Sequence, residues 1–204
     1  MECITIEQGT SLARIFHAAP KAPAVDVYLN NMLVAQGLEF TKLTDYMPVP
    51  MGQYNVQIYA TGDRSNPVIS AMLDVPQGEV LTVAATGDMN DLKLIVLNDN
   101  SEAGVIADGS TIRAVHLSPN APGVNITANG VPLANDLKFR EMTDYVAVPQ
   151  GRYNISVSAS SNNTPVLMFE LSLMNNVIGT AYVLGDLPNL MPMYVIDGGT
   201  YFCK

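Results

Sequence analysis

Hydrophobic and polar residues alternate with a period of two in several short segments of the chain. Tyr54, Val56 and Ile58 alternate with Asn55 and Gln57. Such alternation predicts a strand that buries one face and exposes the other, as in an antiparallel sheet. By the same kind of pattern, further strands are expected at 25–29, 69–75, 81–85 and 92–97. No segment keeps a helical spacing over three turns, so the pattern predicts an all-β protein.

Turn-forming residues separate these segments at short intervals. The segment 25–29 ends at Asn30-Asn31, and a later segment ends at Asn129-Gly130, a pair that favours a tight hairpin because both residues tolerate positive φ. Further turns are expected at 48–52 and 76–78. About seven short strands in about 90 residues, with turns about every 8–12 residues, predict an immunoglobulin-like β-sandwich.

The sequence repeats itself at an offset of 99 residues. Between Arg14 and Asn55, 18 of the 42 residues are identical in the second copy. Beyond Asn55 the offset falls to 98, where Asp88 still matches Asp186. A repeat of this length is a duplicated domain, because solenoid units run only ~20–50 residues. The chain is therefore expected to form two tandem immunoglobulin-like antiparallel β-sandwich domains, and a function confined to one copy should appear as a difference between them.

The repeat also sets the expected domain boundaries. In order, we expect an N-terminal extension at 1–11 with a strand at 4–7, a first domain at 12–98, a linker at 99–111, a second domain at 112–197 and a C-terminal tail at 198–204. The linker is assigned from its many turn formers and small residues.

The repeated residues resemble a known family. The shared pattern falls on Arg14, His17, Pro20, Ala22, Pro23, Val25, Thr44, Asp45, Tyr46, Pro50, Gly52 and Tyr54, and again on Arg113, His116, Pro119, Ala121, Pro122, Val124, Thr143, Asp144, Tyr145, Pro149, Gly151 and Tyr153. The pattern is similar to that of DUF4397, a domain of unknown function found in bacterial surface and secreted proteins, often in tandem. The resemblance implies an immunoglobulin-like fold and an envelope or extracellular setting, and it implies no chemistry.

The second copy departs from the family pattern at two positions. The family has Asp and an aromatic residue there, as the first copy does with Asp26 and Tyr28. The second copy has Asn125 and Thr127 instead. Any role of Asp26 or Tyr28 is therefore not expected in the second domain.

Composition excludes some partners. The chain has 10 Lys and Arg against 19 Asp and Glu, a net charge of −9, which disfavours nucleic acid as a partner. No run of 18 apolar residues could span a membrane. The first residues lack the basic and apolar regions of a secretory signal, so either a signal has been removed or export follows another route. Charged residues are only 14% of the chain, which weakens the barrier to self-association.

The two histidines, His17 and His116, hold equivalent positions in the two copies. A catalytic or metal-binding histidine needs two or three partner groups. Each copy offers at most one carboxylate, Asp45 or Asp144. The favoured interpretation is a structural histidine that hydrogen-bonds the proline-containing turn following it.

An arginine and an aspartate also recur in both copies, as Arg14 with Asp45 and as Arg113 with Asp144. The planar guanidinium suits a carboxylate, so a pairing of strand with loop is expected in both copies. A structural ion pair is favoured, and a ligand clamp is the alternative.

Tyr54 and Tyr153 each follow a Pro-x-Gly turn. This placement is typical of a tyrosine corner, in which the hydroxyl bonds back to upstream backbone. Both are interpreted as residues that determine the fold.

The linker contains oxygen-rich side chains. Asp99 and Asp108, with Asn98 and Asn100, could ligate calcium, but they lack the regular spacing of a calcium loop. A solvated linker is favoured.

Cys3 and Cys203 lie outside the repeat. Two sandwiches in line would place their ends more than ~50 Å apart, so a disulfide between Cys3 and Cys203 of one chain would require the domains to fold back side by side. Each cysteine is therefore a candidate for an intermolecular disulfide in a head-to-tail polymer. The alternative is two unrelated thiols.

Two functions follow from these observations. The first is a non-catalytic structural protein of the cell or spore surface that self-assembles head to tail, as a disulfide-linked fibre. The alternative is an extracellular glycan- or protein-binding module that uses the loops 18–24 and 117–123. No catalytic, cofactor or metal site is expected.

Overall fold

The computed structural model describes residues 4–100 and 104–203, and only the backbone of Cys203. The chain divides into two compact units. The first ends at Asp99 and also contains the described residues after Thr200, and the second is Asn100–Thr200. No described helix is long and apolar enough to cross a membrane.

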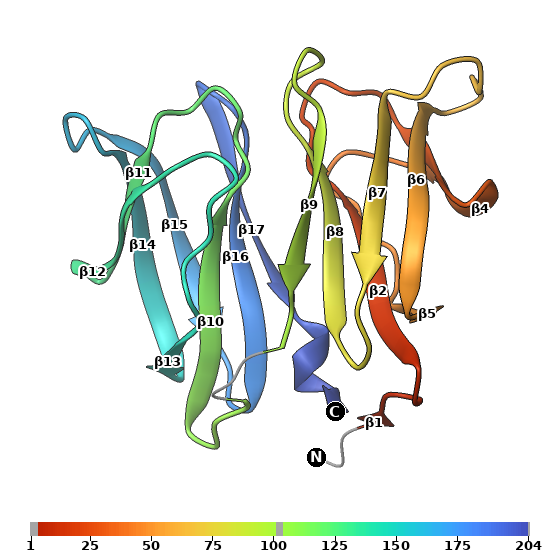
Figure 1. Cartoon of the computed structure of the whole chain (residues 1–204). Helices are drawn as coiled ribbons and strands as arrows, with labels where there is room; N and C mark the ends of the chain where they lie inside the picture. Colours follow the sequence, from red (N-terminus) through yellow and green to blue (C-terminus); the bar gives the residue numbers. More distant parts are fainter. Residues whose placement is uncertain (1–3, 101–103, 204) are drawn as a thin grey trace. The chain divides into compact units, whose positions relative to one another are not determined.

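The first domain is a sandwich of two four-stranded sheets (Figure 1). One sheet has the order β5 (Met47–Pro50), β2 (Thr10–His17), β8 (Val80–Thr86), β9 (Lys93–Asn98). The other has the order β4 (Met32–Leu38), β3 (Val25–Leu29), β6 (Gly52–Ala60), β7 (Ile69–Val75).

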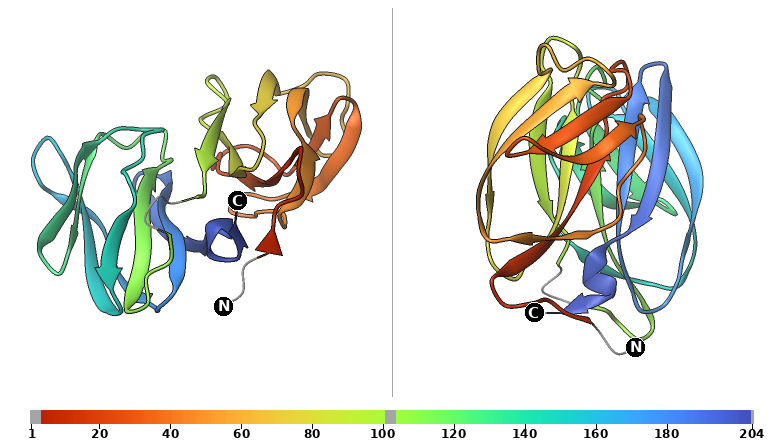
Figure 2. Two further views of the ribbon diagram at one scale, coloured as in Figure 1. Left: turned by 60° about the horizontal axis from the view of Figure 1, so that its bottom comes forward. Right: turned by 90° about the vertical axis from the view of Figure 1, so that its right-hand side faces the viewer.

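The second domain repeats this arrangement, and Figure 2 shows two layers in each domain. Its first sheet is β13 (Val146–Pro149), β10 (Gly109–His116), β16 (Val177–Asp186), β17 (Asn189–Ile196). Its second sheet is β12 (Val131–Leu137), β11 (Val124–Ala128), β14 (Gly151–Ala159), β15 (Pro165–Leu173). A short 3₁₀ turn, Gly198–Thr200, follows β17.

The prediction of two tandem immunoglobulin-like β-sandwiches is confirmed, with one difference in pairing. In each domain one strand pair is parallel: β2 runs parallel to β8, and β10 runs parallel to β16. The remaining pairs within the sandwiches are antiparallel. The parallel pairing sets Arg14 opposite Thr82 and Arg113 opposite Thr180, which matters for the buried polar groups described below.

The core lies between the two sheets of each domain and follows the predicted alternation. On β6, Val56 and Ile58 are buried in the core, whereas Asn55 is exposed. Tyr59 is also buried, although it alternates with Ile58 and so belongs to the outer face of its sheet. Its burial requires other side chains on that outer face.

The connection from β4 to β5, residues 39–46, runs along the edge of β2. Residues 39–46 hydrogen-bond to β2, with the Thr44 amide donating to the Ile15 carbonyl and the His17 amide to the Lys42 carbonyl. Phe16 pairs with Leu43 as an isolated bridge. Residues 42–44 thereby continue, along β2, the antiparallel pairing that β5 makes with its first residues.

Strand boundaries differ from the predicted domain limits at several places. β2 begins at Thr10 and β10 at Gly109, because the first residues of each pair with the strand that follows residues 39–46 or its counterpart. The expected extension strand is β1 (Ile4–Thr5), and it pairs in parallel with β18 (Phe202–Cys203). The expected tail is therefore partly a strand of the first unit.

Candidate functional site

Arg14 is buried and contacts three polar side chains. Its Nε donates to Thr82 Oγ1 at 2.7 Å, and its Nη2 lies 3.6 Å from Asp99 Oδ2. Its guanidinium lies 4.6 Å from the centroid of the Tyr46 ring. The same Asp99 oxygen accepts hydrogen bonds from Thr82 Oγ1 at 2.5 Å and from the Tyr46 hydroxyl at 2.6 Å. The four side chains satisfy one another inside the domain, where an unpaired charge would be costly.

The second domain contains the same quartet. Arg113 Nε donates to Thr180 Oγ1 at 2.9 Å, and its guanidinium lies 4.6 Å from the Tyr145 ring centroid. Asp197 Oδ2 accepts from Thr180 at 2.5 Å and from the Tyr145 hydroxyl at 2.7 Å. Because both copies keep the quartet, we assign it to the fold.

The expected pairing of these arginines with Asp45 and Asp144 is wrong. Both aspartates are exposed, because the Thr-Asp-Tyr segment turns its tyrosine toward the arginine. The acidic partner in the first copy is Asp99, which is buried rather than part of a solvated linker. Its match with Asp197 at the offset of 98 is the sequence signal that would have identified it.

The two aspartates considered as calcium ligands lie in different environments. Asp99 is turned into the quartet, and Asp108 is exposed. Within the ranges 4–100 and 104–203, no group of three or more His, Cys, Asp or Glu side chains could hold a metal ion.

Each histidine is buried and bonded through both ring nitrogens. His17 Nε2 lies 2.9 Å from the Pro23 carbonyl oxygen, and its Nδ1 accepts from the Ala19 amide at 3.3 Å. His116 makes the equivalent bonds, to the Pro122 carbonyl at 3.1 Å and from the Ser118 amide at 3.3 Å. The geometry requires the neutral tautomer with hydrogen on Nε2. Burial lowers the pKa of both histidines below 6.5, so both are neutral near pH 7.

Tyr54 and Tyr153 bond back to the turns that precede them. The Tyr54 hydroxyl donates to the Pro50 carbonyl at 2.8 Å, and the Tyr153 hydroxyl to the Pro149 carbonyl at 2.9 Å. These contacts have the geometry of the tyrosine corner, and each hydroxyl donates its hydrogen to the backbone.

The loops 18–24 and 117–123, expected to bind a ligand, begin with buried residues and continue with partly buried and exposed ones. Ala18, Ala19, Leu117 and Ser118 are buried, and the loop backbones hold the histidines. Neither loop presents a cluster of exposed functional groups comparable to the one described next.

The two copies differ most clearly on the outer face of the β4–β3–β6–β7 sheet. There Tyr28 of β3 and Tyr59 of β6 make an edge-to-face contact, with ring centroids 5.6 Å apart. The Arg64 guanidinium, from the β6–β7 turn, lies 4.1 Å from the Tyr28 ring centroid. We call Tyr28, Tyr59 and Arg64 the aromatic cluster.

The aromatic cluster retains polar groups for a ligand. Among the described residues, the Tyr28 and Tyr59 hydroxyls and the Arg64 guanidinium have no hydrogen-bond or ion-pair partner. Arg64 is exposed and Tyr28 is partly exposed. Gln57, directly opposite Tyr28 on β6, and Ser70, opposite Gln57 on β7, extend this row of polar groups across the sheet.

Asp26 holds the backbone beneath the cluster. Its Oδ1 accepts from the Gly37 amide at 2.8 Å and from Thr61 Oγ1 at 3.1 Å, and its Oδ2 accepts from the Gly62 amide at 3.2 Å. The Gly37 bond is the main reason that the pKa of Asp26 is lowered. Asp26 thereby joins β4 to the turn that carries Arg64.

The second domain lacks the aromatic cluster. Thr127 and Ser158 stand where the first copy has Tyr28 and Tyr59, because Asn125 pairs with Ser158 as Asp26 pairs with Tyr59. The β14–β15 turn has Asn162 and Asn163 in the region where the β6–β7 turn has Arg64. The Asn163 side chain accepts a hydrogen bond from Asn125 Nδ2 at 2.8 Å.

In the second domain, the acidic side chain of this region stands at a different position of the sequence. Asn125 replaces Asp26, and Asp136 stands where the first copy has Gly37. Asp136 accepts from Ser160 at 2.6 Å and pairs with Lys138 at 2.5 Å. The second copy therefore keeps a carboxylate in this region while losing every member of the cluster.

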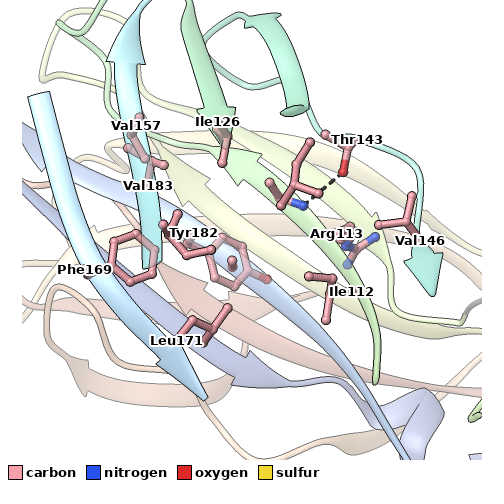
Figure 3. A pocket seen from close by; sticks show the side chains of 14 residues that line it. Ile112, Arg113, Ile126, Thr143, Val146, Val157, Phe169, Leu171, Tyr182 and Val183 are labelled. Atoms are coloured by element: carbon pink, nitrogen blue, oxygen red, sulfur yellow. Dashed lines mark hydrogen bonds between the residues drawn. The ribbon is translucent and has the colours of Figure 1, made fainter. Parts of the chain in front are cut away.

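An apolar cavity lies between the sheets of the second domain (Figure 3). It has a volume of about 40 Å³, and Ile126, Val157 and Phe169 lie around it. The first domain has an equivalent cavity of about 30 Å³. Known apolar cavities that bind benzene are about 150 Å³, so we interpret both as packing voids rather than ligand sites.

Of the two terminal cysteines, the structure describes only Cys203, and only its backbone. Cys3 lies outside the described residues. Cys203 lies on β18, where its backbone is opposite Thr5. The assumption that the chain ends lie too far apart to meet is therefore wrong, and intermolecular cross-linking stays a prediction.

Comparison with known proteins places the sequence in a family and gives distant structural similarities. The family described as "Domain of unknown function (DUF4397)" matches residues 11–127 and 110–200. No curated protein matches the chain.

Two solved structures are similar over most of this chain. One is CBMbc (family CBM26) of Eubacterium rectale Amy13K, crystallised with maltoheptaose, with 10% identity, a TM-score of 0.26, and coverage of 90% of this chain and 96% of that one. The other is a leucine-rich repeat protein of Bacteroides thetaiotaomicron, with 13% identity, a TM-score of 0.22, and coverage of 89% of this chain and 26% of that one.

Proposed function

The chain belongs to the DUF4397 family, whose description assigns no activity, and from the chain's own geometry we propose that it is a non-catalytic saccharide-binding protein of the cell or spore surface. The binding site is the aromatic cluster of the first domain. The observation that carries this proposal is the difference between the copies. The duplication preserves the fold-determining quartet, histidine and corner tyrosine, whereas Tyr28, Tyr59 and Arg64 occur only in the first domain.

A saccharide fits the groups that the cluster presents. Sugars combine apolar C–H faces with many hydroxyl groups, and tyrosine likewise combines an apolar ring with a polar hydroxyl. The two phenol hydroxyls, the Gln57 amide and the Ser70 hydroxyl can exchange hydrogen bonds with such a ligand. The site lies on a sheet face, so it suits an extended chain better than a small molecule that needs enclosure.

The non-catalytic part of the proposal is supported by how the ionisable groups are used. Both nitrogens of His17 and His116 are bonded to backbone, and Asp26 already accepts three hydrogen bonds. A general base must reach the proton that it removes, and these groups face their own backbone. The surface location is proposed from the family resemblance.

To test the proposal, residues of the aromatic cluster are replaced by those that the second domain has at the equivalent positions. We expect the intact protein to bind members of a panel of neutral and acidic oligosaccharides saturably by isothermal titration calorimetry. The double variant Tyr28→Thr/Tyr59→Ser installs the residues of the second domain and should lose this binding at least tenfold. The matched control, Thr127→Ala/Ser158→Ala, changes the same positions of the other domain and should bind like the parent. Absence of binding to the whole panel, or equal loss in the control, would reject the proposal.

Self-assembly head to tail is the second candidate function, favoured by the position of Cys3 and Cys203 outside both repeats. Electrophoresis of air-oxidised protein should then give a ladder that disappears with reductant or with Cys203→Ser. A monomer band in both lanes would reject this candidate.

A further inference from the structure

Resting on the proposed saccharide function, we infer that the aromatic cluster selects a carboxylate-bearing saccharide, one that contains uronic acid residues, with Arg64 as the residue that binds the carboxylate. The protein has a net charge of −9, yet Arg64 is exposed on the sheet face without an ion-pair partner among the described residues. A cation placed in this way attracts an anion that the rest of the surface repels.

The carboxylates near Arg64 in the sequence are already engaged elsewhere. Asp63 Oδ1 accepts from the Ser65 amide at 2.9 Å and from its hydroxyl at 2.6 Å. Asp26 accepts from Gly37, Thr61 and Gly62 as described above. These bonds direct both carboxylates to other groups, and neither forms an ion pair with the Arg64 guanidinium.

The stacking of Arg64 on Tyr28 decides which anion fits. Contact with the ring at 4.1 Å covers one face of the guanidinium and orients its N–H groups. The planar fork of the guanidinium donates two parallel N–H bonds to the two oxygens of a carboxylate. A neutral hydroxyl of the ligand cannot accept such a pair, and a lysine ammonium on the protein cannot donate it. The single guanidinium of the cluster can hold one carboxylate of such a chain in this way.

The second domain supports the specificity of this arrangement. Its exposed cations on the corresponding sheet and hairpin, Arg152 and Lys138, lie 3.8 Å from Glu170 and 2.5 Å from Asp136. Arg64 differs from them because its contact is an aromatic ring rather than a carboxylate.

The experiment compares three tetrasaccharides by calorimetry with the intact protein: an oligogalacturonate, a neutral oligosaccharide of equal length and a sulfated one. We expect the oligogalacturonate to bind at least about tenfold more tightly than the neutral chain, with the preference falling as salt rises. Arg64→Gln should abolish the preference, and Arg64→Lys should restore only part of it because the charge returns without the fork. Arg152→Gln, which removes a cation already paired with Glu170, should leave it unchanged, and unfolding curves will show that each variant is folded.

The outcomes separate this inference from the function on which it rests. Equal binding of neutral and uronate chains, lost in Tyr28→Thr/Tyr59→Ser, would overturn the carboxylate assignment and keep the saccharide function. Tighter binding of the sulfated chain would overturn it in favour of a general anion site. Absence of binding to all three would count against the saccharide function itself, together with the panel described above.

Discussion

Arg14 and Asp99 come from the two ends of the first domain's sequence and meet inside it, with Nη2 and Oδ2 3.6 Å apart. Thr82 and Tyr46 contact both of them. These contacts therefore join β2, the connection from β4 to β5 and the residue that follows β9. The four residue types and the Thr and Tyr contacts recur in the second domain, so we assign the quartet to the fold.

Removal of the acidic partner should destabilise the first domain. Asp99→Asn leaves the Arg14 charge buried without its carboxylate, a change that typically costs about 3–5 kcal/mol. Asp197→Asn should have a comparable effect on the second domain. Urea unfolding of the full chain measures both, with Asp45→Asn as the control, because that side chain is exposed and its loss should cost less than about 0.5 kcal/mol. A large effect of Asp45→Asn would contradict the assignment of the partner.

Acidification should destabilise the protein through its histidines. Burial lowers the pKa of His17 and His116 below 6.5, so below pH 6.5 the unfolded chain binds protons that the folded chain does not. The free energy of unfolding is therefore expected to fall as the pH drops through 6.5, and to level off below the folded pKa values. NMR titration of the two imidazoles, with unfolding measured between pH 8 and pH 5, checks both. A histidine that titrates above 6.5 in the folded protein would contradict this prediction.

The lowered pKa of Asp26 affects stability at a lower pH than the histidines do. Its folded pKa lies below 3.8, so its stabilising contribution is present above that value and is lost as the pH falls through the folded pKa. Asp26→Asn should therefore leave the histidine-dependent loss unchanged and remove a separate loss in stronger acid.

A glycine of the second domain makes room for a tyrosine. A side chain at Gly179 would collide with the Tyr194 ring, whose hydroxyl has a pKa raised to about 12 by burial. Gly179→Ala should cost about 1–3 kcal/mol through overpacking. At the offset of 98 the first domain has Leu81 and Val96 at these positions. Gly179→Ala/Tyr194→Val should therefore recover part of the lost stability, and a double variant no more stable than Gly179→Ala would show that the clash is not the cause.

Filling the cavity of the second domain should stabilise it. Ala114 lies at the cavity, and the first domain has Ile15 at the equivalent position, so the fold accepts a branched side chain there. Void volume costs about 24 cal/mol per Å³, so Ala114→Val, by filling about 40 Å³, should add about 1 kcal/mol. Thermal unfolding measures the gain, and Ala22→Val outside the cavity serves as the control. A loss of stability would show that the void cannot take two methyl groups.

Local patterns predicted the strands and the fold class well, because alternation and turn residues act over a few neighbours. Val56 and Ile58 are buried as their spacing requires, and Tyr54 bonds back to its turn. The parallel pairing of β2 with β8 could not be read in this way, since it depends on which strands become neighbours in space.

The polar partners were harder to predict than the core. The repeated Thr-Asp-Tyr motif predicts Asp45 as the partner of Arg14, whereas Asp99 meets Arg14 only because β2, β8 and β9 become neighbours in the folded sheet. The aromatic cluster was missed for a related reason. Tyr59 alternates onto the outer face, and only the edge contact with Tyr28 and the stacking of Arg64 give that face a distinct chemistry.

The pairing of β1 with β18 has a consequence for how the protein is made. Synthesis proceeds from the N-terminus, and early domains generally fold first. Here Ile4 and Thr5 find their partners, Phe202 and Cys203, only after the entire second domain has been translated. The first domain to emerge from the ribosome is therefore the last to be completed.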